Sequence, residues 1–519
     1  MSASREKQIR QEQANAGQVD TAAIQEETNR KNQKRSSVLY AVIGVVFLIA
    51  LIGSIVWRSN VIAKVTPAVT IDGEKYTAAE VSFYYQNVYQ GFMNNNYYLI
   101  SYIGLDPYSP LKSQTMNETA AAWLGAEEGQ TWYDYFLDQA LFQMSTIQEG
   151  LNAAEAEGFT YPDSVQVQHE TALTYLDSTA ASGGLSAEQY LKNTMGATMT
   201  EKIYSEHMMR LLQFDAYTSA YSNNLTYTDA EIEAAYQEDP VSYDEVACEY
   251  AYISGAAEST TDADGNTVEP TEEESQQAMA DARAVAEELL AAVQAGAALE
   301  TLVEDDEDIV YSQLDNSQYT GDAVSEWMFD DARKAGDSAV LESGNAVYVA
   351  VFHERFRNTD PTIDVRHILI QPAAGTLTAE DEGYEDEQAQ LKADALAQAE
   401  DILSQWKSGE ATEDSFAALA LEYSADGSKY DGGLYTAVYP GQMVTEFNDW
   451  CFASNRKTGD TDVVETPYGA HVMYFVGQNL PYWQTLVVST LQSTDYAEWI
   501  NAFSADSEIT EGSGMKFVG

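Results

Sequence analysis

The stretch WCFASNRKTGDTDVVETPYGAHVMYF, at residues 450–475, decides the fold, because it aligns without a gap on WMFDDARKAGDSAVLESGNAVYVAVF at residues 327–352. Upstream of each stretch, an amphipathic helical pattern ends at a glycine, AVAEELLAAVQAG at 284–296 and AQAEDILSQWKSG at 397–409. Self-similarity at a fixed spacing is the signature of a repeated structural unit. We therefore expect two copies of one fold.

The two copies differ in the residues that could carry chemistry. Between helix and tryptophan the second copy has ten more residues, in a loop rich in glycine and polar side chains, and such loops commonly hold binding and catalytic groups. The second copy also places His367 and His471 in two predicted strands, where the first copy has Tyr250 and Tyr348. The second copy therefore has a paired-histidine site, and the first has the scaffold without it.

The second copy resembles the parvulin-type peptidyl-prolyl isomerases over residues 362–478. The motifs that carry the resemblance occur in the order of that family: RHILI at 366–370, FAALALEYSAD at 416–426, the GGL turn at 432–434, GQMVTEF at 441–447 and TPYGAHV at 466–472. The resemblance implies an α+β fold, with a parvulin domain at 362–480 and a degenerate parvulin-like domain at 245–357.

The same motifs assign candidate site residues. The resemblance implies catalytic roles for His367, Asp426 and His471. It also implies substrate-binding roles for residues that hold a proline ring or precede the second histidine, namely Leu434, Met443, Phe447, Thr466 and Tyr468. The chain departs from the family pattern at the turn, where GGLY replaces the commoner GGDLG, and this shifts the register of Leu434 relative to Met443.

These residue types suit catalysis of rotation about an X-Pro bond, which faces a barrier of about 18–20 kcal/mol and breaks no bond. An apolar pocket made by Met443 and Phe447 would hold the proline and exclude water. Asp426, tuned by the imidazoles, would act on the carbonyl side of the rotating bond. The alternative is that the two histidines only satisfy each other's hydrogen bonds in the core.

A second feature of the sequence is the uncharged run VLYAVIGVVFLIALIGSIVW at 38–57. Twenty helical residues at about 1.5 Å each span a hydrocarbon core of about 30 Å, so we expect a transmembrane helix over 36–58. A cleaved signal peptide is the alternative, but the run is long and no A-x-A pattern follows it. The tail 1–35 is expected in the cytoplasm, because the basic flank of the span is Lys31, Lys34 and Arg35.

Between this span and the repeat, residues 66–240 read as a mainly helical domain. IDGEKYTAAEV at 71–81 predicts a hairpin and then a helix with a Thr77–Glu80 capping box. Together with TDAEIEAAYQED at 228–239, this opening resembles the helical chaperone domain of SurA-like and PrsA-like foldases. Residues 481–519 are expected to form a C-terminal extension.

Composition limits the classes of partner. Of the 26 Lys/Arg and 83 Asp/Glu, 19 and 78 lie beyond residue 35, so the outward part would repel nucleic acid. Two cysteines, Cys248 and Cys451, provide no disulfide framework, and buried thiols or a single disulfide both remain open. The chain lacks the Cys/His spacing of metal sites, so we expect neither metal nor cofactor.

The sequence thus predicts a membrane-anchored, extracytoplasmic foldase, of the kind found in Gram-positive bacteria. It would act as a peptidyl-prolyl cis-trans isomerase and chaperone on newly exported, unfolded chains at the outer face of the cytoplasmic membrane. A homodimer through the helical domain is a further option. The alternative function is a non-catalytic holdase that uses both parvulin-like copies as binding modules.

Overall fold

The structure is a computed structural model that describes residues 5–7, 45–48, 60–127, 129–261, 265, 267–505 and 507–518. The predicted membrane helix at 36–58 lies outside these residues except for 45–48. Within the described part of the chain, no helix has the length and apolarity that crossing a membrane requires. The chain divides into two compact units, a helical unit (1–157, 169–214 and 502–519) and a repeat unit (158–168 and 215–501).

The helical unit opens on the predicted hairpin, formed by β1 (Pro67–Ile71) and β2 (Glu74–Thr77). Thr77 and Glu80 make the predicted capping box at the start of α4 (Ala78–Asn95). A third strand, β13 (Ile509–Glu511), pairs with β1, so the sheet order is β13-β1-β2. The C-terminal residues therefore complete the first sheet of the chain.

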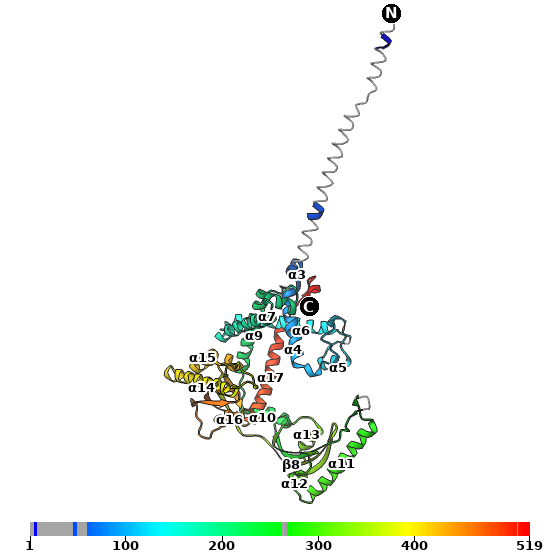
Figure 1. The fold of residues 1–519 in the computed structure, drawn as a ribbon, viewed down its shortest axis with the longest axis vertical. Helices are drawn as coiled ribbons and strands as arrows, with labels where there is room; N and C mark the ends of the chain where they lie inside the picture. The colour runs from blue at the N-terminus through cyan, green and yellow to red at the C-terminus, as the bar shows by residue number, and fades with distance from the viewer. Residues whose placement is uncertain are drawn as a thin grey trace. The chain divides into compact units, whose positions relative to one another are not determined.

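The core of the helical unit is aromatic. Helix α4 packs on α6 (Trp132–Glu157), as Figure 1 shows, and Trp132 and Phe136 stack with ring centroids 5.7 Å apart. Gly196 ends α8, and α9 begins shortly after it. The other elements are α3 (Val61–Val65), η1 (Tyr97–Leu99), η2 (Leu111–Ser113), α5 (Glu118–Leu124), α8 (Ala187–Met195) and η5 (Met515–Phe517), with α7 (Asp163–Ser182) and α9 (Glu201–Asn224) in part.

The repeat unit contains two four-stranded sheets of the same topology. The first has the order β6-β3-β8-β7 and the second the order β10-β9-β12-β11. The strands of the first are β3 (Glu245–Ser254), β6 (Ile309–Ser317), β7 (Ser338–Ser343) and β8 (Ala346–Phe356). Those of the second are β9 (Pro361–Ile370), β10 (Leu434–Val438), β11 (Thr461–Thr466) and β12 (Gly469–Pro481).

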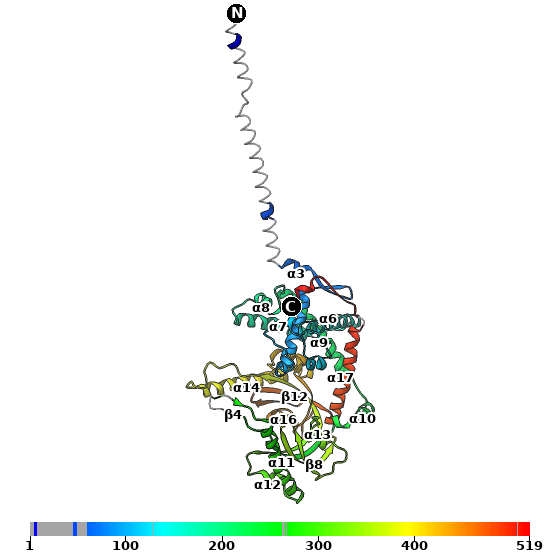
Figure 2. The ribbon, with the colours of Figure 1, turned by 90° about the vertical axis from the view of Figure 1, so that its right-hand side faces the viewer.

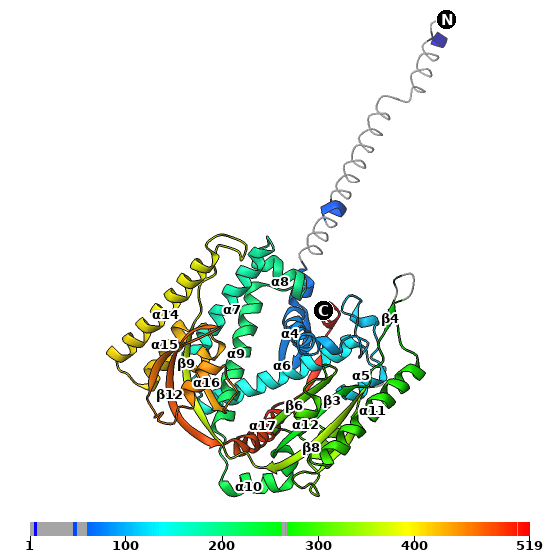
Figure 3. The same ribbon diagram turned by 60° about the horizontal axis from the view of Figure 1, so that its bottom comes forward.

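Helices cover both faces of each sheet. In the second copy, α14 (Tyr384–Ser408) and α15 (Glu413–Tyr423) pack on one face and α16 (Thr445–Cys451) on the other (Figure 3). In the first copy, α11 (Glu272–Gln294) lies along β8 (Figure 2), with α12 (Leu299–Val303) on the same face and α13 (Ala323–Met328) on the other. Because both faces are covered, each central strand has a run of consecutive buried residues rather than an alternation, at 367–370 on β9 and at 470–475 on β12.

The remaining elements of the repeat unit are short, apart from two helices. They are α10 (Asp229–Glu238), η3 (Pro240–Ser242), β4 (Thr260–Thr261), β5 (Thr267–Val268), η4 (Gly427–Asp431) and most of α17 (Tyr482–Ser504). Of the two alternatives for the cysteines, the structure has buried, free thiols, with Cys248 in the first copy and Cys451 in the second.

Candidate active site

The register of the second sheet brings the two predicted histidines onto one face. His367 on β9 lies opposite Met473 on β12, and His471 on β12 lies opposite Leu369. Directly opposed residues of an antiparallel pair share a face. The two imidazoles therefore meet diagonally across the strands, buried, with their Nδ1 atoms 3.1 Å apart.

Asp426 reaches this pair from the loop between α15 and β10, which is longer than the loop between α12 and β6 in the first copy. It caps the 3-10 helix η4, and its Oδ1 accepts a hydrogen bond of 2.8 Å from the backbone N–H of Ser428. Oδ1 also lies 3.5 Å from Nε2 of His367, and the Asp426 side chain is 24% exposed. The neighbouring His367, and after it Ser428, holds the pKa of Asp426 well below its usual range. Asp426 is therefore an ionised carboxylate with access to solvent.

Tyr435 is a site residue that sequence reasoning missed. Its hydroxyl lies 3.1 Å from both carboxylate oxygens of Asp426 and donates to them, and its ring centroid is 4.6 Å from that of His367. Burial, and then the charge of Asp426, raise the pKa of Tyr435 to about 12, so it keeps its proton. Strand alternation in LYTAV could have placed Tyr435 on the histidine face, had the pairing of β10 been known.

Two hydroxyls complete the polar network. Ser428 Oγ lies 3.2 Å from Nε2 of His367, and Thr466 Oγ1 lies 2.9 Å from Nε2 of His471. The Tyr468 backbone N–H donates to Thr466 Oγ1 at 3.2 Å, whereas the Tyr468 side chain is largely exposed. Burial, and then the nearby His367, lower the pKa of His471 to about 4, so His471 is neutral at neutral pH.

The predicted apolar wall is present in part. Phe447 on α16 is buried and presents its ring edge-on to both imidazoles, with centroids 5.5 Å from each. Met443, half-buried, packs into the same apolar cluster as Phe447 and Met473. Leu434 is not brought to the site, because it pairs with Arg366 and so faces the other side of the sheet. Tyr435 occupies the histidine face instead.

The double-glycine turn fixes the loop against β9. Gly433 has φ +75°, and a Cβ built on it would lie 2.2 Å from the carbonyl oxygen of His367. The Gly433 carbonyl in turn accepts a 2.8 Å hydrogen bond from the His367 backbone N–H. Only glycine tolerates both the left-handed conformation and this close approach. The turn thereby sets the position of Asp426 relative to His367.

The geometry joins an ionised, partly exposed carboxylate to an apolar wall. The His471–His367 pair and the hydroxyls bonded to it hold the carboxylate of Asp426 in place. Phe447 and Met443 form the apolar side of the site. Within the described residues, no group of three or more His, Cys, Asp or Glu side chains is arranged to hold a metal ion. The arrangement can orient a substrate amide and place negative charge beside it.

Comparison with known proteins identifies the domain that carries this site. Residues 351–478 match the family model of the PPIC-type PPIASE domain. This match confirms the parvulin resemblance of the second copy and includes every predicted site residue. No curated protein matches the chain.

Solved structures that match this chain include PrsA proteins and SurA-like chaperones. PrsA from Bacillus cereus, a peptidylprolyl isomerase, is 25% identical over 29% of this chain and 50% of its own, with a TM-score of 0.18. PrsA from Bacillus subtilis is 12% identical over 72% of this chain and 88% of its own, with a TM-score of 0.27. A SurA-like chaperone from Campylobacter jejuni is 13% identical over 84% of this chain and 94% of its own, with a TM-score of 0.16. The chain thus spans half the length of the Bacillus cereus protein.

Proposed function

We propose that the PPIC-type domain catalyses cis-trans isomerisation of X-Pro bonds in unfolded client polypeptides. The observation that carries the proposal is the ionised carboxylate of Asp426, held by His367 and Tyr435 beside the apolar side chains of Phe447 and Met443. The site thus combines a negative charge, which would lie beside the carbonyl group of the X-Pro bond, with an apolar pocket, which would hold the proline ring.

The proposed chemistry is electrostatic. Resonance gives the X-Pro bond its double-bond character and places partial negative charge on the carbonyl oxygen. A fixed carboxylate next to that oxygen disfavours the planar, charge-separated form relative to the twisted transition state. The apolar wall holds the proline and excludes water, which strengthens the effect of the charge. The neutral His471 and its partner His367 act as positioning residues for Asp426.

The test is the rate of cis-to-trans conversion of short X-Pro peptides in the presence of the full-length protein. We expect acceleration, and a decrease in kcat/KM of about a hundredfold in Asp426→Asn, the size typical of removing one electrostatic contact from a transition state. Ser489→Ala on α17 is a matched surface control, expected to keep the activity. A folded wild-type protein that accelerates none of the peptides would contradict the proposal.

The second candidate function is a non-catalytic holdase. The observation that favours it is the first copy, which has the parvulin-like sheet but tyrosines at the histidine positions. A holdase would suppress aggregation of an unfolded client equally well in the wild type and in Asp426→Asn. Isomerase activity that depends on Asp426 separates the two functions.

We also propose that the chain works at the outer face of the cytoplasmic membrane, anchored by residues 38–57, on newly exported clients. The support is the uncharged run and its basic N-terminal flank. Protease added outside intact cells should degrade the part beyond residue 60 and spare the tail. Full protection of the whole chain would contradict this location. A homodimer through the helical unit belongs to the same proposal, and light scattering of the purified protein tests it.

A further inference from the structure

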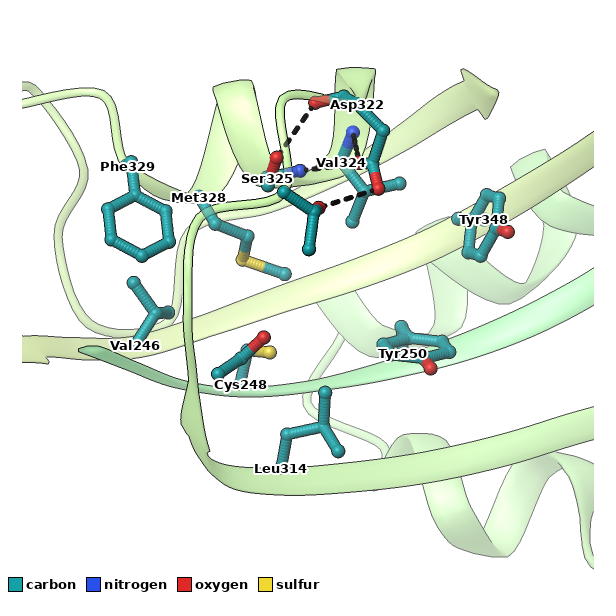
Figure 4. Close-up of a pocket in the computed structure, with 12 residues that line it drawn as sticks. Val246, Cys248, Tyr250, Leu314, Asp322, Val324, Ser325, Met328, Phe329 and Tyr348 are labelled. Carbon is teal, nitrogen blue, oxygen red and sulfur yellow. Dashed lines mark hydrogen bonds between the residues drawn. The ribbon is translucent and has the colours of Figure 1, made fainter. Parts of the chain in front are cut away.

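The first copy contains a pocket of about 200 Å³ between its sheet and α13. Its apolar lining is Val246, Cys248, Leu314, Val324, Met328 and Phe329, with Tyr250 and Tyr348 at one end. Figure 4 shows Phe329 over Val246 and Met328 over Cys248, with the two tyrosines beyond them. Four of these side chains, those of Val246, Cys248, Met328 and Phe329, are buried. These side chains are as buried as those of a hydrophobic core, but they leave a cavity between them.

This pocket lies where the second copy has its candidate active site. Tyr250 lies opposite Ala350, as His367 lies opposite Met473, so the two sheets share one register. The repeat therefore places Ala350 at the position of Met473. Val324 on α13 likewise takes the position of Phe447 on α16. Two large side chains of the second copy are small in the first, and the pocket occupies the space that they leave.

The polar groups of the first copy cannot reproduce the chemistry of the second. Tyr250 and Tyr348 replace the histidines, with ring centroids 5.7 Å apart. The carboxylate in the lining, Asp322, is committed to capping α13: its Oδ1 accepts from the N–H groups of Val324 and Ser325 at 2.8 and 2.9 Å, and Oδ2 accepts from Thr320. The lining thus offers apolar and aromatic surface without a carboxylate free to face a bound amide.

We propose that this pocket binds the prolyl ring of an extended client segment and does not isomerise it. The proposal rests on the proposed function in taking proline-containing chains as the ligands. An apolar cavity of about 150 Å³ can hold a benzene ring, so a pocket of this size accepts a five-membered ring. Aromatic-lined grooves bind proline-rich segments at low entropic cost, because such segments are already extended. The first copy would retain a client that the second copy then processes.

The experiment is photocrosslinking of the full-length protein with a proline-containing peptide that carries a photoreactive group, followed by mapping of the adducts by mass spectrometry. We expect adducts on β3, α13 or β8 of the first copy. Unlabelled peptide should compete for them, and the same peptide with Pro→Ala should compete about tenfold less well, equivalent to about 1.4 kcal/mol. Adducts confined to the second copy would overturn the proposal. So would stronger competition by a further peptide in which phenylalanine replaces the proline.

Matched variants at repeat-equivalent positions locate the binding. Val324→Phe, which restores the bulk found in the second copy, should abolish the first-copy adducts and leave isomerase activity unchanged. Phe447→Val should lower that activity and leave the first-copy adducts in place. If circular dichroism shows that Val324→Phe is misfolded, the smaller filling change Val324→Leu should still weaken the adducts. First-copy adducts that persist when the pocket is filled would refute the site. A wild-type protein without isomerase activity would contradict only the proposed function.

Discussion

Asp426 carries the negative charge of the candidate active site, and Tyr435 donates hydrogen bonds to both of its carboxylate oxygens. The Tyr435 hydroxyl lies 3.1 Å from both carboxylate oxygens and is half-buried with them beside His367. A hydrogen bond to a charged group contributes about 1.5–3 kcal/mol and favours the ionised form. Tyr435 is therefore a positioning residue for the proposed reaction.

We predict that Tyr435→Phe raises the pKa of Asp426 and moves the acid limb of the kcat/KM profile to higher pH. At acid pH we expect kcat/KM to fall about tenfold, equivalent to about 1.4 kcal/mol, which is close to the lower limit for one such bond. Because the pKa of Asp426 lies well below its usual range, the shift is measured by NMR exchange of the peptide from pH 7 down to the lowest pH at which the protein stays folded. A profile that keeps its acid limb while kcat falls uniformly would assign Tyr435 a packing role alone.

His471 gives a prediction about stability rather than activity. Its folded-state pKa, about 4, lies below the value of about 6.5 expected when unfolded, so the unfolded chain binds the proton more readily. The protonation of His471 therefore does not affect the free energy of unfolding above pH 6.5. As the pH falls toward 4, that free energy decreases by about 3 kcal/mol. Hydrogen exchange of β9 and β12 amides at pH 7 and 4.5 should show this loss in wild type and a smaller one in His471→Gln. Equal losses in both proteins would assign the effect to other groups.

Most of the candidate site follows from the sequence because its residues lie in motifs of fixed spacing. His367, Asp426 and His471 meet as expected, and Phe447, Met443 and Thr466 lie beside them. The sequence motif places Leu434 at the site and misses Tyr435, because one missing residue in the turn exchanges the two faces of β10. Sequence spacing does not say which register the strand adopts after such a deletion.

At the scale of elements, the turn into β10 governs the site. We predict that Gly433→Ala destabilises the domain by more than about 2 kcal/mol, because alanine opposes the left-handed conformation and its Cβ would contact the His367 carbonyl. Hydrogen exchange of the β9 and β12 amides at increasing denaturant concentration, read by mass spectrometry, measures the change. Gly427→Ala is the matched control, since a Cβ there meets nothing within 4 Å.

The face assignment of β10 gives a separate prediction. Leu434→Ala should leave KM for X-Pro peptides within about twofold of wild type, because Leu434 shares a face with Arg366 and not with the histidines. Tyr435→Ala should raise KM and lower kcat. Peptide kinetics on both variants decide the matter. A larger effect of Leu434→Ala on KM would restore the proline-binding role that the sequence motif gives it.

The elements themselves were predictable to different degrees. The repeated sheets follow from an alignment that is gapless over β7–β8 and β11–β12, and the Thr77–Glu80 capping box marks the start of α4. The pairing of β13 with β1 was not predictable, because β13 is an exposed strand of three residues that meets its partner far along the chain. Short strands carry too little periodicity to be recognised, and non-local pairing leaves no local pattern.

At the scale of the whole molecule, charge is the dominant property. The formal net charge is −57, and the whole acidic excess lies beyond residue 35, because residues 1–35 are slightly positive. Such a chain repels anionic polymers and attracts basic segments over distances set by screening, about 8 Å at physiological ionic strength. Unfolded clients with a positive charge should therefore be captured faster and more tightly than acidic ones.

We predict that the affinity for a basic unfolded client falls about tenfold as NaCl rises from 0.05 to 0.5 M, since screening removes most of the long-range attraction. The control is the same client sequence with each Lys and Arg replaced by Glu, whose weaker binding should improve or stay constant with salt. Fluorescence anisotropy of both labelled clients measures the two trends. If salt instead weakened binding of the acidic client alone, the surface charge would not be what selects clients, and the apolar pocket of the first copy and the proline site of the second would have to account for affinity by themselves.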